Sequence, residues 1–198
     1  MKITEAVLEQ CKDCPLFVEG KEPKPIEIDY EKWSKDDDGN IDVLFVGEAF
    51  NGRAKEPFEG TAGKLLYEYI DHPYKISHYG VTNMYKCRYS NWSMFNAKSR
   101  PGPHCRDAFI DELKYNPKLI VFLGTFASKA VTKKSVGEMP DAVTTINLRG
   151  QECHIITTSH PTSIDHCDDR DENWKVWNRR WLKIAEYLKG EVLNVIPI

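Results

Sequence analysis

Four of the six cysteines in this chain are spaced so that they restrict how it can fold. Cys11 and Cys14 form a C-x-x-C pair early in the sequence, whereas Cys87 and Cys105 stand alone far along it. Four thiolates from such distant segments can bind one metal ion or one iron–sulfur cluster only if the fold brings the segments together. Zinc is an alternative to iron–sulfur at this point, although zinc sites usually contain two close cysteine pairs. We interpret the other two cysteines as residues that bind no metal.

The composition indicates a globular protein that stays inside the cell. Of the 198 residues, 41% are hydrophobic and 29% are charged, which is ordinary for a soluble domain. The first residues show no signal-peptide pattern, and the longest apolar run, at residues 119–124, is too short to span a membrane. We therefore expect a cytoplasmic monomer without membrane contacts, in which reduced cysteines act as ligands rather than form disulfides.

The net charge of −3 argues against a protein that coats nucleic acid nonspecifically, because such proteins are usually basic. A local basic patch can still bring an acidic enzyme into contact with DNA. The candidate residues for such a patch are Lys129, Lys133, Lys134, Arg179, Arg180 and Lys183.

Apolar segments typical of buried strands alternate with amphipathic segments typical of helices. The strands, the first and last taken together with the turns that end them, are expected at residues 41–49, 79–86, 117–124 and 153–161. The helices are expected at residues 1–14, 62–70, 105–116, 125–134 and 172–189. Thr125 is the expected N-cap of the fourth helix. This alternation predicts a three-layer α/β/α sandwich with a central, mostly parallel four-stranded sheet. We expect a single domain over residues 1–198, with a cysteine-bearing arm at 1–19 and a polar surface segment at 20–40.

Polar residues gather where the predicted strands end. Glu48 follows the first strand, Asn83 lies at the end of the second, and His160 follows the last. In sheets of this kind the active site lies at the carboxyl ends of the strands. The sequence therefore predicts that these side chains share one site.

The C-x-x-C pair is followed by four segments in a fixed order: VLFVGEAFNGRAKEPFEGTAGKLL, GVTNMYKCR, PKLIVFLGTFAS and TTSHPTS. Together they resemble the uracil-DNA glycosylase superfamily, most closely family 4, the iron–sulfur enzymes. The resemblance covers roughly residues 8–190, apart from an inserted polar stretch at residues 20–40. It implies a monofunctional hydrolase of base excision repair. Such an enzyme flips uracil out of single- or double-stranded DNA and cuts the N-glycosidic bond without a covalent enzyme intermediate.

The resemblance also implies a role for each residue that matches a family motif. The implied ligands of a 4Fe-4S cluster are Cys11, Cys14, Cys87 and Cys105. The implied catalytic residues are Glu48, Asn83 and His160. The implied substrate-binding residues are Gly47, Ala49, Phe58, Asn83 and Ser159. The residue that fills the gap left by the flipped base would be one of Thr162, Ser163 and Ile164.

The residue types suit this chemistry. A flipped base is stacked on an aromatic ring and is read along its hydrogen-bonding edge. An amide such as Asn83 donates and accepts at once, which matches the adjacent carbonyl and N–H of uracil. A histidine donor such as His160 can stabilise the negative charge that builds on the departing uracil.

Two segments depart from the family pattern. Phe50-Asn51 replaces a Pro-Gly pair, the loop is shorter, and Glu48 and Glu56 are the only carboxylates nearby in the sequence. The loop after Cys87 also lacks the usual family residues. These departures keep a second interpretation open, namely a glycosylase-fold protein that binds DNA or a modified base without excising uracil.

Overall fold

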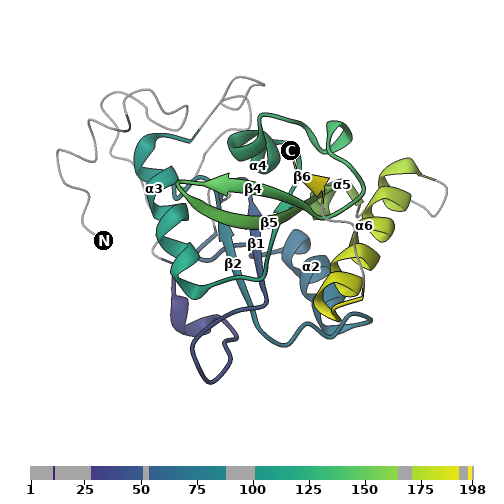
Figure 1. Cartoon of the computed structure of the whole chain (residues 1–198), viewed down its shortest axis with the longest axis horizontal. Helices are drawn as coiled ribbons and strands as arrows, with labels where there is room; N and C mark the ends of the chain where they lie inside the picture. Colours follow the sequence, from purple (N-terminus) through teal and green to yellow (C-terminus); the bar gives the residue numbers. More distant parts are fainter. Residues whose placement is uncertain are drawn as a thin grey trace.

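The computed structural model describes residues 11, 28–50, 54–87, 101–164, 171–191 and 196–197. Its centre is a six-stranded sheet with the strand order β2-β1-β3-β5-β4-β6 (Figure 1). The strands are β1 (Val43–Gly47), β2 (Tyr79–Asn83), β3 (Leu119–Leu123), β4 (Thr144–Leu148), β5 (Gln151–Thr158) and β6 (Ile196–Pro197).

The four predicted strands are confirmed as the parallel run β2-β1-β3-β5, but the predicted count of four strands is wrong. Strand β4 pairs antiparallel with β5, and the two-residue β6 pairs with β4. The β4–β5 connection turns at Arg149 and Gly150, both with positive φ, as in a tight hairpin turn. Because β4 is polar and half-exposed and β6 is very short, neither has the apolar run that marked the other strands.

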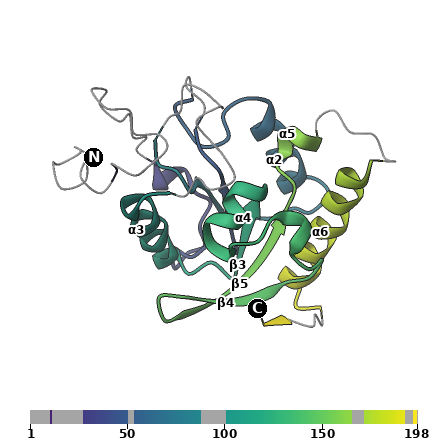
Figure 2. The same cartoon turned by 90° about the horizontal axis from the view of Figure 1, so that it is seen from above.

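Helices cover both faces of the sheet, which confirms the three-layer α/β/α prediction (Figure 2). Successive strand residues point to opposite faces, so each face has its own apolar cluster. One face packs against α3 (Pro103–Glu112) and α4 (Thr125–Thr132). The other packs against α2 (Thr61–Asp71), α5 (Pro161–Ile164) and α6 (Glu172–Leu188). The short 3-10 turns are η1 (Tyr30–Lys32), η3 (Leu113–Tyr115) and η4 (Val136–Glu138).

Most helix positions agree with the sequence prediction, with one exception at an N-cap. Gly124, not Thr125, is the N-cap of α4, and its φ is 92°. A Cβ at Gly124 would lie 3.0 Å from the Cβ of His160, so this position needs glycine for both backbone conformation and space. The helix predicted at residues 1–14 lies outside the described residues except for Cys11. No helix in the described ranges is long and apolar enough to cross a membrane.

The described part of the polar segment, residues 28–40, contributes to the core as well as to the surface. Trp33 is 7% exposed and packs against the rings of Tyr30 and Tyr115 at centroid distances of 5.1 and 5.0 Å. The indole also lies against β2, where a Cβ at Gly80 would approach it to 2.5 Å. The prediction of a purely surface segment missed these contacts, because a single tryptophan in a polar stretch shows no periodicity.

A buried ion pair joins β2 to helix α3. The ammonium of Lys86 donates to both carboxylate oxygens of Glu112, at 2.8 and 2.9 Å, and to Thr82 Oγ1 at 2.7 Å. Thr82 and Tyr30 also donate to Glu112 Oε1, at 2.9 and 3.2 Å. Burial lowers the pKa of Lys86 and raises that of Glu112, so each charge depends on the other. The backbone N–H of Lys86 donates to Cys105 Sγ at 3.4 Å, which ties the same segment to α3 a second time.

Replacing Lys86 by methionine should lower the free energy of unfolding by about 3–5 kcal/mol, because it leaves the Glu112 carboxylate buried without its counter-ion. The double variant Lys86→Met with Glu112→Leu should recover much of this loss, since no charge is then buried. Urea unfolding measures both effects.

The matched control is Asp107→Asn, which breaks an exposed ion pair with Arg149 and should cost less than about 1 kcal/mol. A Lys86→Met variant as stable as this control would contradict the structural role of the buried pair.

Candidate active site

The polar residues singled out from the sequence meet at the carboxyl ends of the parallel strands. Gly47, the last residue of β1, is in register with Asn83, the last residue of β2. Ser159 and His160 follow β5 directly. The structure therefore brings Glu48, Asn83 and His160 together, since all three line the same small cavity of about 100 Å³.

The ring of Phe58 forms one wall of this cavity. A Cβ at Gly47 would lie 2.4 Å from Phe58 Cζ and 2.3 Å from Asn83 Oδ1, so the ring and the amide both rest on the bare glycine backbone. Phe58 has a φ of 55°, and its carbonyl lies where a side chain at Gly63 would stand. The two glycines therefore allow the turn after residue 54 to present an aromatic ring beside Asn83.

His160 lies opposite this wall as a neutral imidazole. Its ring is nearly parallel to that of Phe58, with centroids 5.8 Å apart and planes at 24°. Its Nδ1 accepts the backbone N–H of Thr162 at 3.3 Å and lies 2.8 Å from Thr162 Oγ1. This assigns the proton of the neutral ring to Nε2. Burial lowers the pKa of His160 to about 4, so the ring is uncharged at neutral pH.

Glu48 is a buried carboxyl group at the same site. Its side chain is 7% exposed, and burial raises its pKa to about 7. Within the described residues its Oε1 has no hydrogen-bond partner. A carboxyl group with a pKa near neutrality can accept or release a proton at physiological pH, which suits a general base.

Asn83 has an unused donor. The residue is 2% exposed, and its Nδ2 has no hydrogen-bond partner among the described residues. An unpaired buried amide costs free energy, so its presence beside an aromatic wall indicates a polar ligand that completes its hydrogen bonds. Together with Nε2 of His160, the site offers two hydrogen-bond donors at a cavity of about 100 Å³.

The remaining predicted substrate-binding residues lie around the same space. Ala49 lines the small cavity, and Ser159, which is 7% exposed, lines a larger groove of about 880 Å³ that also touches Glu48 and His160. The groove extends past the N-terminus of α4 at Thr125.

Two residues contribute to the cavity in ways that the sequence prediction did not assign. Phe50, which stands where the family has a proline, is 1% exposed and lines the cavity. Thr162 orients the imidazole of His160 through its backbone N–H. Because the donor is a backbone N–H, which every residue except proline carries, the sequence held no specific sign of this contact. Ile164 is 2% exposed in the core, which leaves Thr162 and Ser163 as the exposed candidates for filling the gap in DNA.

The predicted basic patch at residues 179–183 is wrong in part. Arg180 is 2% exposed, and its guanidinium binds Asp141 and the carbonyl oxygens of Thr157, Val136 and Met139. It is a structural residue because a buried guanidinium needs all these acceptors. Arg179 is paired with Asp141 and Glu172, and Lys183 is paired with Glu186. Lys133 and Lys134 are exposed at the end of α4, and Lys129 is partly buried.

Three of the four candidate ligand cysteines are described. Cys11 is buried in the apolar cluster that Cys87 also contacts, and Cys105 lies in the first turn of α3. The hydrogen bond from the Lys86 backbone to Cys105 Sγ suits an electron-rich thiolate. Within the described ranges no three His, Cys, Asp or Glu side chains form a group that could hold a metal ion, and Cys14 lies outside them. The cysteine thiols therefore suit a metal cluster, and the residues that the structure describes include three of its four proposed ligands.

Comparisons with known proteins agree with this geometry. The family model described as the uracil DNA glycosylase superfamily matches residues 34–181. A type-4 uracil-DNA glycosylase of Archaeoglobus fulgidus is 29% identical over 139 residues, which cover 62% of this chain and 66% of that protein. The chain thus spans slightly less than two thirds of that relative. The matched range contains the described site residues and leaves out Cys11 and Cys14.

Glu48→Gln should stabilise the fold at high pH and leave its stability unchanged at low pH. The folded-state pKa of about 7 exceeds the ordinary value of 4.5, so the wild type loses stability as pH rises through this interval. The full loss amounts to about 3 kcal/mol, because each pKa unit corresponds to about 1.4 kcal/mol. Urea unfolding at pH 4 and pH 8 measures the difference between the two proteins. An equal difference at both pH values would show that Glu48 does not titrate in this range.

Proposed function

Because the chain belongs to the uracil-DNA glycosylase superfamily, as a divergent member similar to family 4, we propose that it excises uracil from DNA by hydrolysis. The observation that carries this proposal is the buried Nδ2 of Asn83, which lies beside the ring of Phe58 and has no partner among the described residues. The substrate base would enter the small cavity after rotating out of the DNA stack. There it would stack on Phe58 and pair with Asn83.

The side-chain amide of Asn83 can recognise the base through both its N–H donor and its oxygen acceptor. Nδ2 of Asn83 donates to a uracil carbonyl, and Oδ1 accepts the adjacent ring N–H. Cytosine presents the opposite pattern on the same edge, with an amino donor and a ring-nitrogen acceptor. The backbone at Gly47 holds the amide in place, because any larger residue would displace both Oδ1 and the Phe58 ring.

The reaction breaks the bond between C1′ of the sugar and N1 of uracil. The electron pair of this bond moves onto the uracil ring, and Nε2–H of His160 stabilises the resulting oxyanion by hydrogen bonding. A neutral imidazole suits this role: the low pKa of His160 leaves the ring with a single proton at neutral pH, and the N–H of a neutral imidazole is too weak an acid to pass that proton to the base. Water adds to C1′, and its proton passes to ionised Glu48. The products are an abasic site, which is the input of base excision repair, and the uracil anion, which takes up a proton from solvent as Glu48 returns its proton to solvent.

The groove beside the cavity suits a DNA strand. Backbone N–H groups at the start of α4 can contact a phosphate, as can the exposed hydroxyls of Thr162 and Ser163. We propose DNA as the partner of this face and a cytoplasmic monomer as the active form.

We further propose that Cys11, Cys14, Cys87 and Cys105 bind a 4Fe-4S cluster, with zinc as the alternative occupant. The proposal is supported by the resemblance to family 4 and by the thiolate-type environment of Cys105. Such a cluster would supply a structural link between the cysteine-bearing segments and take no part in the hydrolysis. Cys105 and Cys87 would connect it to the end of β2, close to Asn83 in the sequence.

His160→Ala and Asn83→Ala should each lower single-turnover uracil excision about 100-fold or more, because each removes a donor that acts on the departing base. The measurement is the formation of alkali-labile sites in an oligonucleotide that contains deoxyuridine. Asp38→Asn is the control, because Asp38 is exposed and lines neither the small cavity nor the groove. Wild-type rates in both site variants would refute the assignment, and an inactive wild type would favour a DNA- or base-binding protein instead.

The rate should rise with pH and level off above about pH 7, because only ionised Glu48 can accept the proton of water. Glu48→Gln should be slower and should lack this rise. Rates measured from pH 5 to pH 9 with both proteins test the point. The same pH profile in wild type and Glu48→Gln would assign the proton acceptor to another group.

The purified protein should be brown, with broad absorption near ~400 nm and about four irons per chain. Cys105→Ala should remove most of this absorption, and Cys153→Ala should not, because Cys153 lies in β5 and is not one of the proposed ligands. Metal analysis that finds zinc without iron would contradict the cluster proposal.

A further inference from the structure

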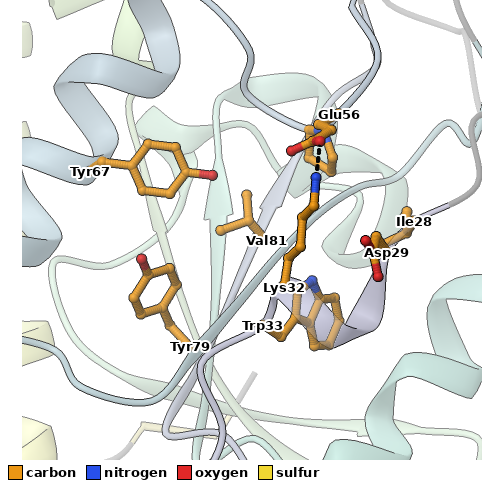
Figure 3. Close-up of a pocket in the computed structure, with 9 residues that line it drawn as sticks. Ile28, Asp29, Lys32, Trp33, Glu56, Tyr67, Tyr79 and Val81 are labelled. Atoms are coloured by element: carbon orange, nitrogen blue, oxygen red, sulfur yellow. Dashed lines mark hydrogen bonds and ion pairs between the residues drawn. The ribbon is translucent and has the colours of Figure 1, made fainter.

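A second cavity lies beside the candidate base pocket, along the edge strand β2 (Figure 3). Its volume is about 260 Å³, slightly below the roughly 300–1,000 Å³ of drug-sized sites, which suits a single ring system. Glu56 lines both this cavity and the base pocket, so the two spaces are neighbours. The site described above does not use this cavity.

Three aromatic side chains form much of its wall. Tyr67 of α2 and Tyr79 of β2 have ring centroids 6.3 Å apart, and the hydroxyl end of Tyr67 points into the cavity (Figure 3). Trp33 is held rigidly between the backbone of Gly80 and the ring of Tyr115. Aromatic walls of this kind stack nucleobases with little dependence on sequence.

The charged groups of the cavity favour an amino group over a phosphate. Asp29 and Glu56 supply two carboxylates, and Lys32 supplies one ammonium that is paired with Glu56. Asp29 accepts one backbone N–H from Glu31 at 3.2 Å, and a carboxylate has room for further donors. A ligand with an exocyclic amino group can therefore bind Asp29, whereas a phosphate would meet excess negative charge.

One wall comes from outside the shared family domain. Four of the lining residues, Ile28, Asp29, Lys32 and Trp33, precede the range 34–181 that the family model matches. They belong to the polar stretch interpreted above as an insertion relative to the family pattern. One wall of the cavity therefore lies outside the matched family range.

We propose that this cavity binds the nucleobase next to the flipped uracil, and that it prefers a base with an exocyclic amino group, such as cytosine. The proposal rests on the proposed function, because it places the neighbouring nucleotide of the same strand. Contacts to flanking nucleotides commonly set the sequence context of enzymes that act on flipped bases. A carboxylate accepting the amino group of cytosine is a known form of base readout. The protein would thus recognise uracil through the neighbouring base as well as through the hydrogen-bonding edge of uracil itself.

The test compares oligonucleotides that differ only in the nucleotide on either side of the target: cytosine, thymine or an abasic analogue. Affinity is measured by fluorescence anisotropy with an uncleavable abasic analogue at the target position, and excision by single-turnover rates with deoxyuridine there. On one of the two sides of the target, an oligonucleotide with a cytosine neighbour should bind about tenfold tighter than one with an abasic neighbour, because cytosine adds one stacked base. It should also bind tighter than thymine.

Asp29→Asn should remove the preference for cytosine over thymine and keep the fold, since asparagine caps a helix start as well as aspartate does. Asp38→Asn, at an exposed aspartate outside the cavity, should keep the preference. Equal affinity for all neighbours on both sides, or an unchanged preference in Asp29→Asn, would overturn the proposal. A preference in affinity without any excision would contradict the proposed reaction and support this cavity as a base site.

Discussion

The buried Lys86–Glu112 ion pair is the contact on which the candidate site depends. It connects the end of β2, which carries Asn83, to helix α3, which carries Cys105. Two opposite charges this deeply buried hold only one arrangement, because any separation leaves a charge without solvent or partner. The pair therefore fixes the strand end that carries Asn83, the proposed base-reading residue, and a proposed cluster ligand in one rigid unit.

The second constraint is the absence of side chains at two glycines. Gly47 lets the amide of Asn83 and the ring of Phe58 share one position against the backbone, and Gly124 lets His160 approach the start of α4. The result is a pocket in which, among the described residues, polar atoms of Asn83 and Glu48 have no partner. A preformed site of this kind is less stable than an apolar core, and under the proposed function the bound base would supply the missing hydrogen bonds.

The sequence predicted much of the site and less of its surroundings. Gly47, Asn83 and His160 could be placed because apolar parallel strands end at one edge of a sheet. The family resemblance supplied Phe58, whose position depends on a left-handed backbone turn that no periodicity reveals. Arg180 was misassigned because charge alone does not show that Asp141 and three carbonyl groups surround it. Strand β4 and the buried Trp33 were missed, since both depend on tertiary contacts rather than on local pattern.

The most direct test of base recognition is a crystal structure of the protein with free uracil. The ring should lie on Phe58, with its carbonyl and N–H edge paired to Nδ2 and Oδ1 of Asn83 and a second carbonyl near Nε2 of His160. Uracil bound elsewhere, for example between Tyr67 and Trp33, or an Asn83 amide that makes no contact with it, would contradict the assignment of this pocket.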